Sequence, residues 1–410
     1  MKRLTTAWLL ALSLASAWAD GAGLQQALVA NDVLRLEQLA RRPGEQGALA
    51  RAVALSLRHR DAEARPALER MAAARLPAAE RAAALQELSA LLTRQGHYGA
   101  AARALDDADR LHPLDAEAQQ ARAFVAALAE LPPMTVEPGP RARLAITRDA
   151  AGLARVDASA EGQAQQFVVD TGAAFSTVTE STARRLGLRL LDTEASVGTV
   201  SRDALRTRFA VGRELALGSA VLHDVVFIVL PDEALSFAGG AYRIEAILGL
   251  PVFLKLGRLG VEQGDGQETL SLGSAAPETR EPANLMLSGV QPLLLARSET
   301  AGRTLRLFVD TGAKATHLFA NAAQASPQLL RQARRQAHTL GGAGGSSTDD
   351  AARNLPALTL RVGTRRTTLA DVALLSRVAP DRDGAVGQDL LRQGRGYVMD
   401  FERMCLSLLP

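Results

Sequence analysis

The chain has 410 residues, of which 47% are hydrophobic and 22% charged, so it is long enough for two or three domains and is not a disordered chain. The formal net charge is +3, the positive residues are mostly arginines scattered among acids, and only 4% of residues are aromatic, which argues against a nucleic-acid-binding surface. The single cysteine, Cys405, excludes an intrachain disulfide.

The N-terminus has the pattern of an export signal. Lys2 and Arg3 precede the apolar run "AWLLALSLASA", which ends in Ala17-Trp18-Ala19, an arrangement typical of a cleavage site. We therefore predict a signal peptide over residues 1–19 and an exported protein, located in a bacterial periplasm or secreted. The alternative is an uncleaved membrane anchor, although the run is short for a membrane span. No membrane span is predicted after signal cleavage.

Residues 20–130 are rich in Ala, Leu, Arg and Glu at helical spacing, which predicts an α-helical domain. The segment "LQELSALLTRQGHYGAAARALDDADRLHPLD" places small and large apolar residues, Gly96 at a turn and Pro113 at a helix end in a pattern that resembles a tetratricopeptide repeat. This resemblance implies a surface for a protein partner. A spacer, a dimer contact or an ordinary helical bundle remains an alternative.

The helical pattern ends at a proline-rich segment, which we interpret as a linker over residues 131–141. Short β-like runs and Gly-rich turns follow, in two copies of similar order. "QFVVDTGAAFSTV" recurs as "RLFVDTGAKATHL", "LHDVVFIVL" as "LADVALLSR", and "AILGLPVFLKLGRLGVE" as "AVGQDLLRQGRGYVMDF". The repeat predicts two mainly-β lobes, over residues 142–275 and 276–410.

Two Asp-Thr-Gly motifs lie inside matching repeats, and each is followed later in its lobe by two apolar residues and Gly. This arrangement resembles the aspartic peptidases of the pepsin and retropepsin group. The fold class that this implies is multidomain: a tetratricopeptide-like helical domain and a mainly-β bilobal acid-peptidase-like domain. The resemblance also implies an aspartic endopeptidase that acts on a peptide or an unfolded protein. No cofactor, metal or nucleic acid is expected.

The chemistry explains why two aspartates are needed. Asp170 and Asp310 are 140 positions apart, one in each repeat. Two adjacent carboxyl groups that share one proton can activate a water and protonate the departing amine, and their like charges push the two pKa values apart. We therefore predict Asp170 and Asp310 as the catalytic pair, without assigning a fixed acid or base.

The resemblance assigns roles to the neighbours of each Asp. The threonines would hydrogen-bond across the lobes, the glycines and alanines would allow close packing, two apolar-Gly segments would lie behind the loops, and Gly-rich turns would be flaps. The predicted support residues are Thr171, Gly172, Ala173, Thr311, Gly312 and Ala313. The predicted apolar-Gly residues are Ile247, Leu248, Gly249, Ala385, Val386 and Gly387. The flap candidates are Gly198, Gly341, Gly342, Gly344 and Gly345.

Two residues after the second motif have no parallel in the first. Lys314 would depress the pKa values of the pair if its cation lay close to them, or else points to solvent. His317 would form a hydrogen bond behind the loop, or else is a packed or surface residue. The rival function is a catalytically silent peptide- or protein-binding module that uses the same cleft and the helical repeats.

Overall fold

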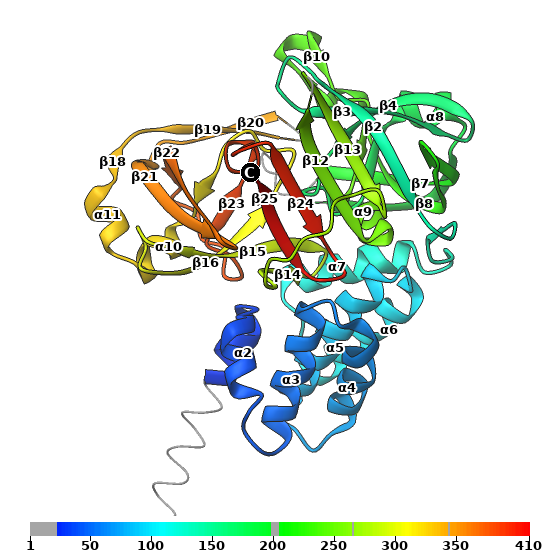
Figure 1. Cartoon of the computed structure of the whole chain (residues 1–410). Helices are drawn as coiled ribbons and strands as arrows, with labels where there is room; N and C mark the ends of the chain where they lie inside the picture. Colours follow the sequence, from blue (N-terminus) through cyan, green and yellow to red (C-terminus); the bar gives the residue numbers. More distant parts are fainter. Residues whose placement is uncertain (1–22, 198–204, 265, 343–344) are drawn as a thin grey trace, which may run out of the picture.

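A computed structural model describes residues 23–197, 205–264, 266–342 and 345–410 (Figure 1). The predicted signal peptide, residues 1–19, lies outside these ranges. An all-helical N-terminal region is followed by two β-barrel lobes. None of the helices in the described ranges is both long and apolar enough to cross a membrane.

Residues 23–29 are helical and precede six further helices. These are α2 (Val33–Leu39), α3 (Glu45–Leu57), α4 (Asp61–Ala73), α5 (Ala78–Arg94), α6 (Tyr98–Leu111) and α7 (Ala116–Ala127). Gly96 joins α5 to α6 with a φ of 79°, and a Cβ there would lie 2.9 Å from Cα of Pro133. Glycine is thus needed at this turn for both conformation and space. The tetratricopeptide identity of the region stays a prediction.

The first lobe is a β-barrel, and the strand that precedes Asp170 lies near the middle of the strand order of its sheet. Its strands are β1 (Thr135–Val136), β2 (Arg141–Arg148), β3 (Ala154–Ala160), β4 (Gln163–Val169), β5 (Ser176–Thr179), β6 (Arg189–Val197), β7 (Leu205–Leu217), β8 (Ala220–Leu230), β9 (Ser236–Phe237), β10 (Tyr242–Arg243), β11 (Ala246–Leu248), β12 (Arg258–Gly264) and β13 (Gln267–Gly273). Its helices are α8 (Glu180–Leu186) and α9 (Leu250–Leu256), with 3₁₀ turns η1 (Asp232–Leu235) and η2 (Ala238–Gly240). Strand β11 pairs parallel with β4 and antiparallel with β5.

The second lobe repeats this topology. Its strands are β14 (Leu285–Ser288), β15 (Gln291–Ser298), β16 (Arg303–Val309), β17 (His317–Leu318), β18 (Arg334–Arg335), β19 (His338–Gly342), β20 (Gly345–Asp349), β21 (Arg353–Val362), β22 (Arg365–Leu374), β23 (Gly384–Val386), β24 (Gly396–Asp400) and β25 (Cys405–Leu409), and its helices are α10 (Ala320–Ala325), α11 (Gln328–Gln332) and α12 (Gln388–Leu391). Strand β23 pairs parallel with β16 and antiparallel with β17, as β11 does with β4 and β5. The segments that echo one another in sequence therefore occupy equivalent places.

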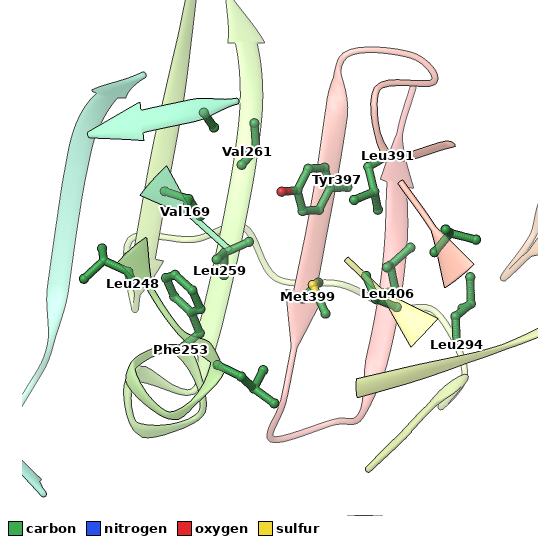
Figure 2. Close-up of a cluster of buried hydrophobic side chains, with 14 of the residues drawn as sticks. Val169, Leu248, Phe253, Leu259, Val261, Leu294, Leu391, Tyr397, Met399 and Leu406 are labelled. Carbon is green, nitrogen blue, oxygen red and sulfur yellow. The ribbon is translucent and has the colours of Figure 1, made fainter. Parts of the chain in front are cut away.

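The lobes share one sheet and one core. The last strands of the second lobe join the sheet of the first in the order β25-β24-β12-β13-β2, so the sheet crosses the boundary between residues 275 and 276. Figure 2 shows the core beneath it, where side chains such as Leu259 and Phe253 of the first lobe lie near Met399 and Leu406 of the second. Burial of this continuous apolar surface holds the lobes together.

The segment interpreted as a linker is partly built into the first lobe. Thr135 and Val136 pair with β8, and Arg141 already begins β2. The proline-rich sequence predicted a linker, but backbone pairing with Leu222 and His223 of β8 orders Thr135 and Val136.

The helical region packs on both lobes. Met286 and Leu293 of the second lobe belong to the helical region's apolar core. Asn31 donates a hydrogen bond to Ser288 at 2.9 Å, and Arg94 donates one to the carbonyl of Gly289 at 3.0 Å. Helix α7 instead contacts β6 of the first lobe. The helices therefore bridge the two lobes (Figure 1).

Candidate active site

Each predicted catalytic Asp follows an inner strand directly. The amide of Asp170 donates to the carbonyl of Leu248 at 3.1 Å, and the amide of Asp310 donates to the carbonyl of Val386 at 3.1 Å. The ladders β4–β11 and β16–β23 thus continue into both aspartates. The predicted apolar-Gly segments supply these ladders, with Ile247 opposite Val168 and Ala385 in the equivalent place.

The glycine that ends each apolar segment lets the Asp loop pass. A Cβ on Gly249 would lie 2.6 Å from the carbonyl oxygen of Phe175, and one on Gly387 would lie 2.7 Å from that of Ala313. Real Cβ atoms do not approach backbone atoms this closely, so only glycine fits. The carbonyls of Ala173 and Ala313 also accept hydrogen bonds at 2.9 Å, from the amides of Leu250 and Gln388.

Two hydroxyl residues at the site were missed by the sequence analysis. Ser176 accepts a hydrogen bond from the amide of Gly249 at 3.1 Å, and Thr316 accepts one from the amide of Gly387 at 3.3 Å. Both are buried. Each is the sixth residue after its Asp, so the shared offset in the repeat was a signal that could have found them.

The two threonines join the loops across the lobes. Thr171 donates through Oγ1 to the carbonyl of Val309 at 2.7 Å, and Thr311 donates through Oγ1 to the carbonyl of Val169 at 2.9 Å. In turn, the amide of each threonine donates to the hydroxyl of the other, at 2.9 Å from Thr171 and 3.3 Å from Thr311. Both side chains are only 1% exposed, so water does not compete for these four bonds.

The carboxyl groups meet beside the two glycines. A Cβ on Gly172 would lie 2.5 Å from Oδ1 of Asp310 and 2.9 Å from Oδ1 of Asp170. A Cβ on Gly312 would lie 2.6 Å from Oδ2 of Asp170. The amides of Gly172 and Gly312 each donate to the Asp of their own loop, at 2.8 and 2.9 Å. The structure therefore brings the two carboxyl groups close together, beside two glycines whose missing side chains leave room for them.

The electrostatics of the pair follow from burial and proximity. Burial raises the pKa of Asp170, and the glycine amides oppose this shift. Burial, and next the negative charge of Asp170, raise the pKa of Asp310 well above its ordinary value. Two carboxylates this close cannot both ionise readily, so the pair retains one shared proton at pH values where an isolated Asp has lost it.

Three of the flap candidates lie on one hairpin of the second lobe. Strands β19 and β20 pair with each other, and Gly341, Gly342 and Gly345 lie at their tip. Leu340 of this hairpin packs on Phe319 and Leu375 of the second lobe. Strands β6 and β7 pair in the first lobe. Gly198 and Gly344 fall outside the described residues.

Lys314 and His317 differ in their surroundings. The side chain of Lys314 is exposed to solvent. Burial lowers the pKa of His317 to about 4, and a hydrogen bond to the backbone of Ala315 opposes this shift. Its Nε2 is buried without a hydrogen-bond partner in the described part of the chain. His317 is therefore a neutral, packed side chain near neutral pH.

We expect the shared proton to make stability depend on pH. A carboxyl whose pKa is higher in the folded state stabilises the fold fully below its unfolded pKa of about 3.9, and this stability is lost as the pH rises through the folded pKa. Asp310→Asn should therefore unfold at a higher temperature than the wild type at pH 7, with the difference vanishing near pH 3. Thermal unfolding from pH 3 to 8 measures this. The control is Asp157→Asn, an exposed carboxylate on β3; an equal gain there would contradict the assignment to the pair.

Comparison with known proteins gives a family match over part of the first lobe. Residues 156–252, which include Asp170 and the segment from Ile247 to Gly249, match the family model described as aspartyl protease. None of the curated proteins matches the sequence. Among solved structures, the chain is similar to a retropepsin-like aspartic protease from Rickettsia conorii, with 17% identity, coverage of 34% of this chain and 96% of that chain, and a TM-score of 0.22.

The first lobe thus carries the match to the aspartyl protease family, within a chain that has two barrel lobes on one polypeptide. In the described ranges, no group of three or more His, Cys, Asp or Glu side chains is arranged to hold a metal ion.

Proposed function

We propose that this protein is an exported aspartic endopeptidase that hydrolyses peptide bonds with a water activated between Asp170 and Asp310. The observation that carries the proposal is the meeting of these two carboxyl groups, with raised pKa values, across a set of buried threonine hydrogen bonds. The match of the first lobe to the aspartyl protease family supports it. Export is supported by the charged, apolar and small-residue order of residues 1–19.

In this mechanism the ionised carboxylate of the pair takes a proton from water as the water attacks the substrate carbonyl carbon. The protonated carboxyl gives its proton to the carbonyl oxygen, which leaves a neutral tetrahedral intermediate. When the C–N bond breaks, the proton taken from water passes to the leaving nitrogen, and the intermediate returns a proton to the pair. The pair ends with the one proton it began with.

We infer the substrate class from the two hairpins of the lobes. Hairpins β6–β7 and β19–β20 extend one from each lobe, and we propose them as the flaps over an extended peptide. Extended chains bind by strand-like backbone pairing, which needs no particular sequence. Unfolded proteins and flexible peptides are therefore the proposed substrates.

The test is cleavage of a peptide library by the mature protein from pH 3 to 8. We expect a bell-shaped profile, because hydrolysis needs one proton on the pair. Activity should fall as the pH rises through the raised pKa, where that proton is lost, and again at low pH, where both carboxyls are protonated. An aspartic-peptidase inhibitor should abolish the activity.

Tight peptide binding without turnover at any pH in this range would contradict the proposal and favour the silent binding module. N-terminal sequencing of the protein recovered from cells tests export separately, with cleavage after Ala19 expected. Recovery of an intact N-terminus would contradict removal of the signal peptide.

A further inference from the structure

Helix α7 contacts two parts of the first lobe through one aromatic residue. The ring centroid of Phe124 lies 5.0 Å from that of Phe175 and 5.0 Å from that of Phe209, edge-on to the latter. Phe175 is in the loop that begins with Asp170, and Phe209 is on β7 of the hairpin β6–β7. Near the end of the same helix, the hydroxyl of Thr193 on β6 donates to the carbonyl of Ala127 at 3.0 Å. The helical region therefore holds the Asp170 loop and the hairpin together.

This contact lies on the same side of the lobe as the carboxyl of Asp170. Phe167 and Val169 of β4 face the main core, whereas Val168 belongs to a separate apolar cluster with Ile247. Side chains alternate along a strand, and the ladder with β11 continues to the amide of Asp170, so Val168 and Asp170 point to one side.

The helical region completes that apolar cluster. Tyr98 and Leu128 are buried in it, and Phe124 packs against it. Tyr98 also approaches Phe175, with ring centroids 6.2 Å apart. The cluster beside Asp170 is thus built jointly by the lobe and by the helices that precede it.

The second lobe also meets the helical region, through Phe308 two residues before Asp310, but its Asp loop offers no aromatic residue at the position of Phe175. The residue five positions after Asp310 is Ala315, which is exposed, whereas the residue five positions after Asp170 is Phe175, which is 5% exposed. The backbone of Phe175 is also the part of the loop that packs against Gly249. A displaced Phe175 ring would therefore shift the backbone that follows Asp170.

We propose that Phe124 is a positioning residue of the active site, which fixes the Asp170 loop and the hairpin β6–β7 relative to each other. This inference rests on the proposed peptidase function. Under this proposal the helical region is not a spacer but helps to hold the active site in place, because the Asp170 loop and the hairpin β6–β7 contact the same side chain of α7.

The kinetic test uses the full-length mature protein with Phe124→Ala, Phe124→Leu and Val125→Ala. Val125 is buried on the same helix but faces the helical core, so it is a matched control for lost packing. Because small misplacements of reacting groups are costly, Phe124→Ala should lower kcat for a peptide substrate at least about tenfold, with a smaller change in KM. Phe124→Leu, which restores apolar volume, and Val125→Ala should both stay within about threefold of the wild type.

Hydrogen exchange of the substrate-free protein gives a second readout that does not need activity. Amides of residues 171–176 and 205–210 should exchange at least about fivefold faster in Phe124→Ala and at the wild-type rate in Val125→Ala. The proposal would be overturned if kcat and amide exchange were unchanged in Phe124→Ala. It would also be overturned if Val125→Ala lowered kcat as much as Phe124→Ala does. A rise in activity in Phe124→Ala, as expected if α7 obstructs the site, would overturn it as well. If the wild type cleaves nothing, the proposed function fails, while the exchange data still decide whether Phe124 positions the loop.

Discussion

Replacing either Asp170 or Asp310 by Asn is expected to lower kcat/KM for peptide hydrolysis by about 1,000-fold or more, in the middle of the range for removing a general acid or base. Asn cannot accept the proton of the attacking water or return it to the leaving amine. Since both roles belong to the pair, each single variant should be as inactive as the double variant. Steady-state cleavage of an unfolded protein substrate, followed by quantification of new N-termini, measures the effect.

Asp157→Asn serves as the control for this experiment, because it removes an exposed carboxylate of β3, whereas both carboxyls of the pair are buried. It should keep wild-type activity. Circular dichroism should show that both active-site variants remain folded, since Asn fills the volume of Asp. Substantial hydrolysis by both Asp170→Asn and Asp310→Asn would show that cleavage, if present, uses other groups.

The second large effect concerns stability. Thr311→Val removes the hydroxyl that accepts from the amide of Thr171 and donates to the carbonyl of Val169. Both backbone groups would then lie buried without these partners, and each such group costs about 1–3 kcal/mol. We expect the free energy of unfolding to fall by about 3 kcal/mol, and activity to fall with it, because these bonds hold the two loops together. Denaturant unfolding monitored by far-UV circular dichroism measures the first effect.

Thr368→Val is the matched control. Thr368 is exposed on β22, and its hydroxyl forms an exposed hydrogen bond with the hydroxyl of Thr359 at 3.0 Å. This change should alter the free energy of unfolding by less than about 0.5 kcal/mol. If Thr311→Val were no more destabilising than Thr368→Val, the cross-lobe bonds would not be what fixes the two loops.

The internal repeat accounts for most of what could be predicted from the sequence. Matching Asp-Thr-Gly segments indicated two equivalent lobes, and equivalence alone places Asp170 and Asp310 across an approximate twofold axis. The glycines of the two apolar-Gly segments were predictable for the same reason. A motif that is kept in both copies indicates that both copies need the same local backbone geometry, such as the close packing of Phe175 against Gly249.

Features that join distant parts of the chain were not predictable from local patterns. The pairing of β12 with β24 depends on the orientation of whole lobes. Thr135 and Val136 lie in a proline-rich stretch, yet a free strand edge on β8 orders them. Phe124 looked like one apolar residue of an ordinary helix, because its partners Phe175 and Phe209 are 51 and 85 positions away. Register between domains is decided by tertiary packing, which short-range periodicity does not encode.

The shared sheet determines how the carboxyl pair responds to dilution of the protein. Because β24 and β25 complete a sheet begun by β12 on the same polypeptide, the two halves of the carboxyl pair meet at an effective concentration set by the connecting chain and not by the amount of protein. Dilution of the protein therefore does not separate Asp170 from Asp310. Activity per molecule should stay constant into the range of protein concentration where a site assembled from two separate chains would dissociate.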